Sequence, residues 1–182
     1  MREGSKILAA SVVVSTLVLG SAVTTTSNAN VASAQEVMSQ HDSGIDAKTQ
    51  KTYYNYDGYT TYDGAFTQDE YFVQALKYDN VTINGYKVDA TASGGYTSNK
   101  HLYDQSVQFN EDGDVLEIVF FTKPDSITKA AFKDAHHQNE IIEEGELGNE
   151  EGNFVKYKTM DGSYTAFFDP NDNLIEITIT NK

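Results

Sequence analysis

Two adjacent histidines followed by three glutamates are the residues of this chain best suited to hold a metal ion. His136 and His137 precede Glu140, Glu143 and Glu144, and imidazole together with carboxylate suits divalent transition ions. Neighbouring helical residues point about 100° apart, so both rings cannot easily meet one ion while the helix continues. The chain also lacks the H-E-x-x-H spacing that places two imidazoles on one helix face. We therefore predict a solvated helix end here, with no metal and no cofactor.

Two short segments resemble calcium-binding loops because oxygen-bearing side chains occur at alternate positions. They begin at Asn110, with the letters NEDGDV, and at Asp169, with DPNDNL. An EF-hand loop needs glycine at its sixth position and glutamate at its twelfth. The first segment has Val115 and Phe121 there, and the second has a leucine and a threonine. We therefore predict that both segments are hairpin turns.

The chain contains no sequence pattern that is typical of nucleophilic catalysis. There is no cysteine and no serine in a G-x-S-x-G context, and the histidines do not lie in a recognisable triad. Gly94 and Gly95 form too short a run for a phosphate-binding loop. We predict no catalytic residues and no enzymatic activity, and keep a secreted metal-dependent enzyme as a remote alternative.

Four lysines are the candidates for contacts with nucleic-acid phosphates. Lys129 and Lys133 are spaced i, i+4 in a predicted helix, and Lys156 and Lys158 are spaced i, i+2 in a predicted strand. Each pair therefore shares one face of its element. Tyrosines could add stacking on the bases of a single strand. These lysines are the predicted site if the chain binds nucleic acid.

The charge balance argues against such a partner. The 182 residues include 13 Lys and Arg against 27 Asp and Glu, a net charge of −14. Without residues 1–34, 11 lysines and no arginine face 26 carboxylates, a net charge of 11 − 26 = −15. Such a surface repels anionic partners unless the lysines gather on one face. Without arginine, bidentate contacts to phosphate or guanine are excluded.

The first 34 residues have the pattern of a secretory signal peptide. Arg2 and Lys6 are followed by an apolar run over residues 7–19 and by Ala32, Ser33 and Ala34 as a small-residue cleavage site. The apolar run is shorter than the roughly 20 residues of a membrane-spanning helix. We predict cleavage after residue 34, a flexible polar leader over 35–52, and a single domain over 53–182. The lack of cysteine fits export without disulfides.

A helix signal follows a tyrosine-rich segment. Thr67 and Glu70 have the spacing of a capping box, and Phe66 and Tyr71 that of a hydrophobic staple. The apolar residues 72, 75 and 76 then follow the spacing of a buried helical stripe. Five tyrosines occur between residues 53 and 62. We favour packing against the helix for them over an exposed contact surface.

The remaining pattern predicts an α+β fold. Extended segments are expected over 81–88, 105–109 and 115–122, with a turn at residues 110–114, and the last is apolar enough for a central strand covered on both faces. A second helix should run from Asp125 or Ser126 to about His136, with residues 127, 130, 131 and 135 inward. An acidic connector over 139–152 should precede strands at 154–160, 163–168 and 174–180. In the last strand, Ile175, Ile177 and Ile179 should face the core. The order suggests two αβββ-like units, with one antiparallel sheet packed against two helices.

The segments YYNYDGY at Tyr53, ALKYDNV at Ala75 and NGYK at Asn84 resemble the immunodominant staphylococcal antigen B family. The resemblance implies a secreted, non-enzymatic antigen that is exposed to host antibodies and released or held at the cell surface. Nucleic-acid binding is an activity proposed for that family, and the resemblance carries over no residue-level site. We therefore expect an extracellular binding protein with an unidentified ligand, and a nucleic-acid-binding module as the alternative.

Overall fold

A seven-stranded antiparallel sheet, in the order β4-β5-β6-β10-β9-β8-β7, forms the centre of the fold. The computed structural model describes residues 33–34, 52–148 and 151–181. Apart from residues 33, 34 and 52, the predicted signal peptide and polar leader lie outside the described residues. The strands are β4 (Ser98–Leu102), β5 (Gln105–Phe109), β6 (Val115–Phe121), β7 (Ile141–Glu146), β8 (Asn153–Lys158), β9 (Ser163–Phe168) and β10 (Leu174–Thr180).

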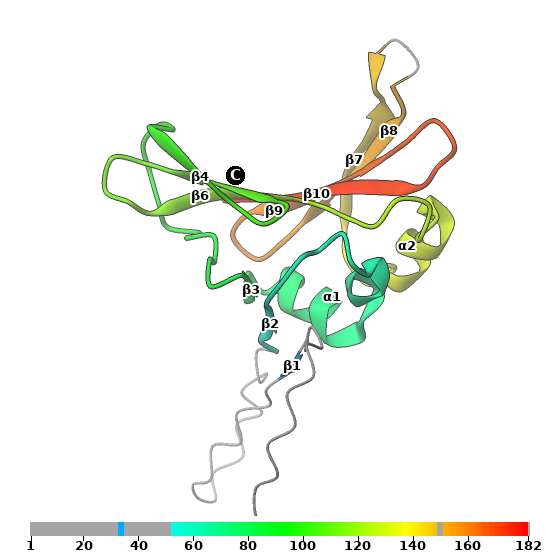
Figure 1. The fold of residues 1–182 in the computed structure, drawn as a ribbon, viewed down its shortest axis with the longest axis horizontal. Coiled ribbons are helices and arrows are strands. Elements are labelled where there is room, and N and C mark those ends of the chain that lie inside the picture. The colour runs from blue at the N-terminus through cyan, green and yellow to red at the C-terminus, as the bar shows by residue number, and fades with distance from the viewer. Residues whose placement is uncertain (1–32, 35–51, 149–150, 182) are drawn as a thin grey trace, which may run out of the picture.

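A second, three-stranded sheet and the helices lie together on one face of the large sheet (Figure 1). In the small sheet, β2 (Tyr54–Tyr56) pairs antiparallel with β1 (Ser33–Ala34) and parallel with β3 (Val81–Ile83). The helices are the 3-10 helix η1 (Gly64–Gln68), α1 (Glu70–Lys77) and α2 (Lys129–Ala135). The opposite face of the large sheet is covered by no helix of the described residues.

The α+β class is confirmed, and the two-unit arrangement stays a prediction. Each helix precedes an antiparallel meander, but these contain three strands, β4 to β6, and four strands, β7 to β10. The first predicted strand, β3, pairs with β2 outside the large sheet. Edge strand β4 lies between two segments that were expected to be extended, and edge strand β7 lies in the predicted acidic connector. Both are exposed along nearly their whole length, so neither has the apolar alternation that identifies a half-buried strand.

The start of α1 differs from the predicted capping box. Asp69 is the N-cap, and its carboxylate accepts from the N–H of Tyr71 at 2.8 Å. Thr67 belongs to η1 and donates its hydroxyl to the main-chain oxygen of Gly64. The staple is also wrong, because Tyr71 is 52% exposed while Phe66 packs edge-on against Phe72. Asp is as good an N-cap as Ser or Thr, and the tight turn η1 shifts the helix start by two residues.

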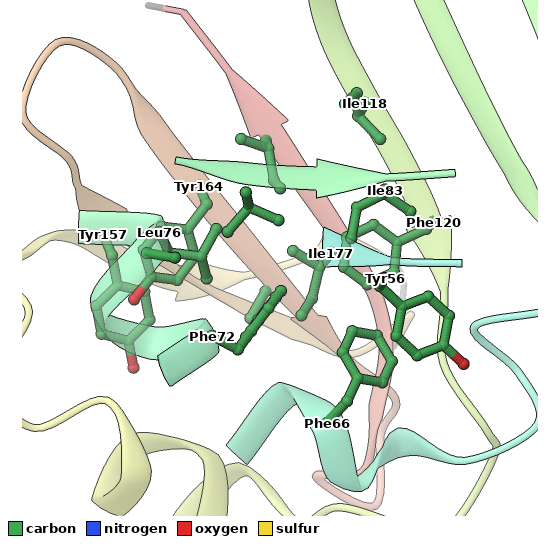
Figure 2. Packing of buried hydrophobic residues seen from close by; sticks show 14 of the residues in the cluster. Tyr56, Phe66, Phe72, Leu76, Ile83, Ile118, Phe120, Tyr157, Tyr164 and Ile177 are labelled. Carbon is green, nitrogen blue, oxygen red and sulfur yellow. The ribbon is translucent and has the colours of Figure 1, made fainter. Parts of the chain in front are cut away.

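The buried stripe of α1 is confirmed and forms part of the main core. Phe72, Ala75 and Leu76 are at most 1% exposed. Figure 2 shows Phe72 and Leu76 packed among side chains of the large sheet. Tyr54 and Tyr56 in β2 are buried in the same cluster. The predicted packing of the tyrosine segment therefore holds for these two residues.

Helix α2 is shorter than predicted and turns a different residue inward. Thr128 is its N-cap, accepting from the N–H of Ala131 at 3.2 Å. Ala130 is exposed, whereas Phe132 is fully buried. The large ring of Phe132 removes more apolar surface from water than an alanine methyl group, so the helix presents this residue to the sheet.

Within the part of the chain that the structure describes, only one face of the central strands is covered. Strand β6 does lie inside the sheet, between β5 and β10, but its Phe121 is 50% exposed on the uncovered face. The prediction of cover on both faces is therefore wrong. In β10, Ile177 and Ile179 face the core as predicted. A register shift between residues 174 and 176 turns Leu174 inward, and Ile175 is only half-buried.

Candidate functional site

Two of the four candidate lysines share a single glutamate. Lys129 Nζ lies 2.8 Å from Glu144 Oε1, and Lys133 Nζ lies 2.9 Å from Glu144 Oε2. The lysines project from α2, and the glutamate projects from β7 toward the same side of the sheet. Hydrogen bonds from both ammonium groups lower the pKa of Glu144. The single carboxylate offsets one of the two positive charges.

The other two lysines lie on β8 rather than on α2. Lys156 and Lys158 alternate along β8 with Val155 and Tyr157, which are buried under the helices. Lys156 lies opposite Glu143 in the β7–β8 pairing, and Lys158 Nζ is 3.8 Å from a Glu140 oxygen. The four lysines therefore form two separate pairs, one on α2 and one on β8. Nucleic-acid binding through these residues stays a prediction.

His136 is buried and does not lie at a solvated helix end. Its ring is 0% exposed and stacks on Phe132 with centroids 3.9 Å apart. His136 Nε2 lies 2.9 Å from the main-chain oxygen of Thr67, and Nδ1 lies 2.7 Å from the hydroxyl of Tyr164. His137 is exposed at the surface. Phe132 and His136 are spaced i, i+4, and this signal places both rings on one helix face.

The hydrogen-bond partners fix the position of each proton in this buried chain. The oxygen of Thr67 can only accept, so His136 carries its proton on Nε2 and its Nδ1 accepts from Tyr164. Asn139 Nδ2 in turn donates to the Tyr164 oxygen at 2.8 Å and to the main-chain oxygen of Val73 at 3.3 Å. Burial lowers the pKa of His136 to about 4, although the Thr67 contact opposes this. The imidazole is neutral at physiological pH.

This buried polar chain links α2, β9 and α1 through hydrogen bonds. Its members are His136, Tyr164 and Asn139, so no carboxylate takes part in it. Burial raises the pKa of Tyr164 well above its usual value, and the phenol stays protonated. Within the described residues, no three His, Cys, Asp or Glu side chains gather as metal ligands. The described segments 110–114 and 169–173 are hairpin turns, as predicted.

A surface pocket adjoins the outer end of this chain. Its volume is about 450 Å³, and it lies between the C-terminal end of α1, the segment 138–140 and the end of β8. Asn139 lines it and is 6% exposed. The Oδ1 atom of Asn139 has no hydrogen-bond partner among the described residues. No local sequence pattern indicates this pocket, because its walls come from three distant segments.

Three exposed tyrosines form a second candidate site, here called the tyrosine surface and consisting of Tyr59, Tyr62 and Tyr103. They are 54%, 71% and 55% exposed. The rings of Tyr59 and Tyr103 meet edge to face with centroids 4.8 Å apart. The N–H of Tyr62 donates to the oxygen of Tyr59 in a turn. Tyr59 and Tyr62 are thus exposed, contrary to the packing that the sequence analysis favoured for this segment.

Asp104 holds the tyrosine surface together. Its two carboxylate oxygens accept from the N–H groups of Thr60 at 3.0 Å and Thr61 at 2.6 Å. The segment of Tyr59 and Tyr62 is thereby fixed to the β4–β5 turn that carries Tyr103. Partial burial would raise the pKa of Asp104, but these hydrogen bonds prevail and lower it. The sequence showed no local signal for this contact across more than 40 residues.

Among the described residues, no helix is long and apolar enough to cross a membrane.

Comparison with known proteins yields one family. The chain is 30% identical over 102 residues to proteins called immunodominant staphylococcal antigen B from Staphylococcus aureus strains USA300, COL and N315. These matches cover 53% of this chain and 57% of each relative, so the chain spans little more than half their length. No solved structure matches the chain significantly. Because the model of the family described as immunodominant staphylococcal antigen B matches residues 53–179, this chain belongs to the immunodominant staphylococcal antigen B family.

Proposed function

We propose that the protein is secreted and acts outside the cell as a non-catalytic binding protein of the cell surface or biofilm matrix. The observation that carries this proposal is the tyrosine surface. Three rings that each expose more than half of their area in one place are costly to leave in water. Tyrosine combines apolar area with a polar hydroxyl, and such residues are enriched where proteins contact partners.

Other features support a binding role over an enzymatic one. The relatives are named as antigens. The chain of His136, Tyr164 and Asn139 is buried and lacks a carboxylate or a reactive nucleophile. The N-terminal segment has the charge and apolar pattern of an export signal. Together these observations favour recognition by a rigid surface outside the cell.

Co-sedimentation of the purified chain with matrix polysaccharide and with intact staphylococcal cells tests this function. Replacing Tyr59 and Tyr103 by serine should weaken binding at least tenfold while leaving the melting temperature nearly unchanged, because both rings are exposed. Tyr96→Ser is the matched control, since Tyr96 is 56% exposed but lies outside the tyrosine surface. Unchanged binding by the double variant, or binding that Tyr96→Ser weakens equally, would contradict the proposal.

A nucleic-acid-binding module is the second candidate, and the same tyrosines favour it because aromatic rings stack on unpaired bases. A gel-shift with an oligothymidine strand should then appear at low salt and vanish as salt rises. Glu144→Gln offers a sharper test, because it frees Lys129 and Lys133 from their shared carboxylate. If these lysines bind phosphates, this variant should bind more tightly than the unmodified chain. No shift at low salt for either protein would exclude this function.

A further inference from the structure

The uncovered face of the large sheet carries a row of aromatic rings. Phe154, Phe167 and Phe121 point away from the core, because each has a fully buried neighbour in sequence and side chains alternate along a strand. Phe154 pairs with Phe167 across β8 and β9, and their ring centroids lie 6.3 Å apart. Phe121 in β6 is 50% exposed. The helices and the small sheet lie on the other face (Figure 1), so no helix of the described residues shields these rings from water.

Glu176 lies within this row, between two of the rings. In the register of the sheet it is directly opposite Phe167 in β9 and directly opposite Phe121 in β6. Side chains that are directly opposed in an antiparallel pair have their Cβ atoms about 5 Å apart. Glu176 is therefore half-buried on a face that no described helix covers, because these neighbouring side chains flank it.

Glu176 and Glu117 lack a cationic partner in the part of the chain that the structure describes. Neither carboxylate takes part in an ion pair there. Their hydrogen bonds come from neutral groups, the Thr178 hydroxyl at 3.3 Å and the Gln108 amide at 2.6 Å. Burial raises the pKa of both carboxyl groups, and the charge of Glu176 adds to the rise for Glu117. A nearby cation would therefore stabilise both anions.

Charge decides which partner fits this face. The net charge of −14 attracts cations and repels nucleic acid, and a second copy would bring the same carboxylates together. A guanidinium group fits best, because it pairs with carboxylates through two hydrogen bonds and stacks on aromatic rings. No described residue is an arginine, so a partner must supply this group.

The spacing along β6 gives the pattern that such a partner needs. Glu117, Val119 and Phe121 point to the same face at every second position, and Glu176 lies opposite Phe121. The face therefore suits a cation above Glu117, an apolar group above Val119 and a second cation above Glu176. An extended segment laid along β6 presents side chains to it at positions i, i+2 and i+4 with the same rise.

We propose that this face binds an extended cationic peptide segment of the pattern Arg-x-apolar-x-Arg. Its two guanidinium groups donate to the carboxylates of Glu117 and Glu176, and the second also stacks on Phe121. Its apolar side chain covers Val119. The inference uses no residue of the tyrosine surface, so it can be tested separately from the proposed function.

NMR titration of the isotope-labelled chain with the peptide acetyl-Arg-Ser-Leu-Ser-Arg-amide tests the inference. We expect saturable shifts of the β6 and β10 amides at low salt, with an affinity that falls as salt rises. The peptide acetyl-Arg-Arg-Leu-Ser-Ser-amide has the same charge but different spacing and should bind at least fivefold more weakly. The Glu117→Gln, Glu176→Gln double variant should also lose at least fivefold in affinity for the first peptide.

Two controls separate this site from general attraction of a cation to an acidic chain. The Glu111→Gln, Asp112→Asn double variant makes the same charge change in the exposed β5–β6 turn and should bind as the unmodified chain does. Phe121→Ser should weaken binding at least threefold. Tyr71→Ser is its control, because Tyr71 is similarly exposed, at 52%, but lies on α1.

Three results would overturn the inference. The first is no shift of the β6 and β10 amides at millimolar peptide. The second is equal affinity for the two peptides, which would show that charge alone attracts them. The third is an equal loss in the turn variant and in the Glu117→Gln, Glu176→Gln variant. All of the substituted side chains are at least partly exposed, so each variant should fold, and a melting curve confirms it.

Discussion

His136 donates its Nε2–H to the main-chain oxygen of Thr67 at 2.9 Å, although 69 residues separate them in sequence. The bond joins the end of α2 to η1, the turn that precedes α1. With Phe132 stacked on one side of the ring and Tyr164 bonded to Nδ1, the imidazole connects α2 and η1 to β9. The arrangement needs a neutral ring, because an unprotonated Nδ1 must accept the hydrogen bond that the Tyr164 hydroxyl donates.

The protein should therefore become less stable in acid. As the pH falls, the His136 imidazole is protonated in the unfolded chain while it stays neutral in the folded chain. The pKa of His136 is about 4 in the fold against 6.5 for an unperturbed histidine. Its contribution is present above pH 6.5 and decreases as the pH falls toward 4. At about 1.4 kcal/mol per pH unit, the loss amounts to roughly 3 kcal/mol. Urea denaturation at pH values from 7.5 to 4 measures it.

A variant at the neighbouring histidine serves as a control, and an NMR titration separates this effect from that of the many carboxylates. His137→Gln removes an exposed histidine and should keep the full loss of stability in acid. In NMR spectra of the native chain, the ring signals of His136 should titrate only near pH 4. A titration of His136 near pH 6.5 would show that water reaches the ring and would refute the prediction.

Two stacked tyrosines should respond differently when each is replaced by phenylalanine. Tyr157 and Tyr164 lie parallel with centroids 4.8 Å apart, but only the Tyr164 hydroxyl is bonded, to His136 and Asn139. Tyr164→Phe should lower the free energy of unfolding by about 1 to 3 kcal/mol, because it leaves buried polar atoms unpaired. The Tyr157 hydroxyl has no partner among the described residues, so Tyr157→Phe should cost nothing or stabilise slightly. Chemical denaturation compares the two, and equal losses would contradict the prediction.

The helix stripe and the hairpins could be predicted because their signals are local. Phe72, Ala75 and Leu76 follow helical spacing, and the Asp112-Gly113 pair supplies its own turn. Both predictions depend on residues that lie within a few positions of one another in the sequence. The structure confirms them because tertiary packing agrees with local preference there.

The edges and the sites could not be predicted because distant segments create them. β7 carries glutamates at 143, 144 and 146 and resembles a connector, yet it completes the sheet through its main-chain pairing with β8. The burial of His136 depends on β8, β9 and η1 around it, although Phe132 four residues earlier marks the shared face. Asp104 and Asn139 are single polar residues whose importance comes from the loops that they meet in the fold.

Loss of the Asp104 carboxylate should increase the mobility of the tyrosine surface and leave the rest of the fold unchanged. Asp104→Ala removes the acceptor of the Thr60 and Thr61 N–H groups, and charged hydrogen bonds contribute roughly 1 to 3 kcal/mol before solvent screening is considered. We expect at least tenfold faster hydrogen exchange at these two amides, with the exchange of β9 unchanged. Asp112→Ala, in the exposed β5–β6 turn, is the control. If the Thr60 and Thr61 amides are equally protected from exchange in both variants, the Asp104 carboxylate is not what fixes this segment, and the prediction is wrong.

The uncovered face of the sheet provides the last prediction. Glu176 in β10 and Glu117 in β6 are half-buried there, and burial raises the pKa of both, with Glu176 also raising that of Glu117. A carboxyl whose pKa is raised in the fold stabilises the protein at low pH and loses that contribution as the pH rises through the folded pKa. Glu176→Gln imitates the protonated form, so it should raise the melting temperature at pH 7 and have little effect near pH 4. Solvent screening keeps the gain small, on the order of 1 to 2 °C.

The general charge of the chain must be separated from this local effect. Removing any carboxylate from a chain with a net charge of −14 reduces overall repulsion. Glu111→Gln makes the same charge change at an exposed turn position and should gain less at pH 7. Differential scanning calorimetry of the two variants at both pH values decides the matter. If Glu111→Gln stabilises the chain as much as Glu176→Gln, net charge and not burial governs the effect.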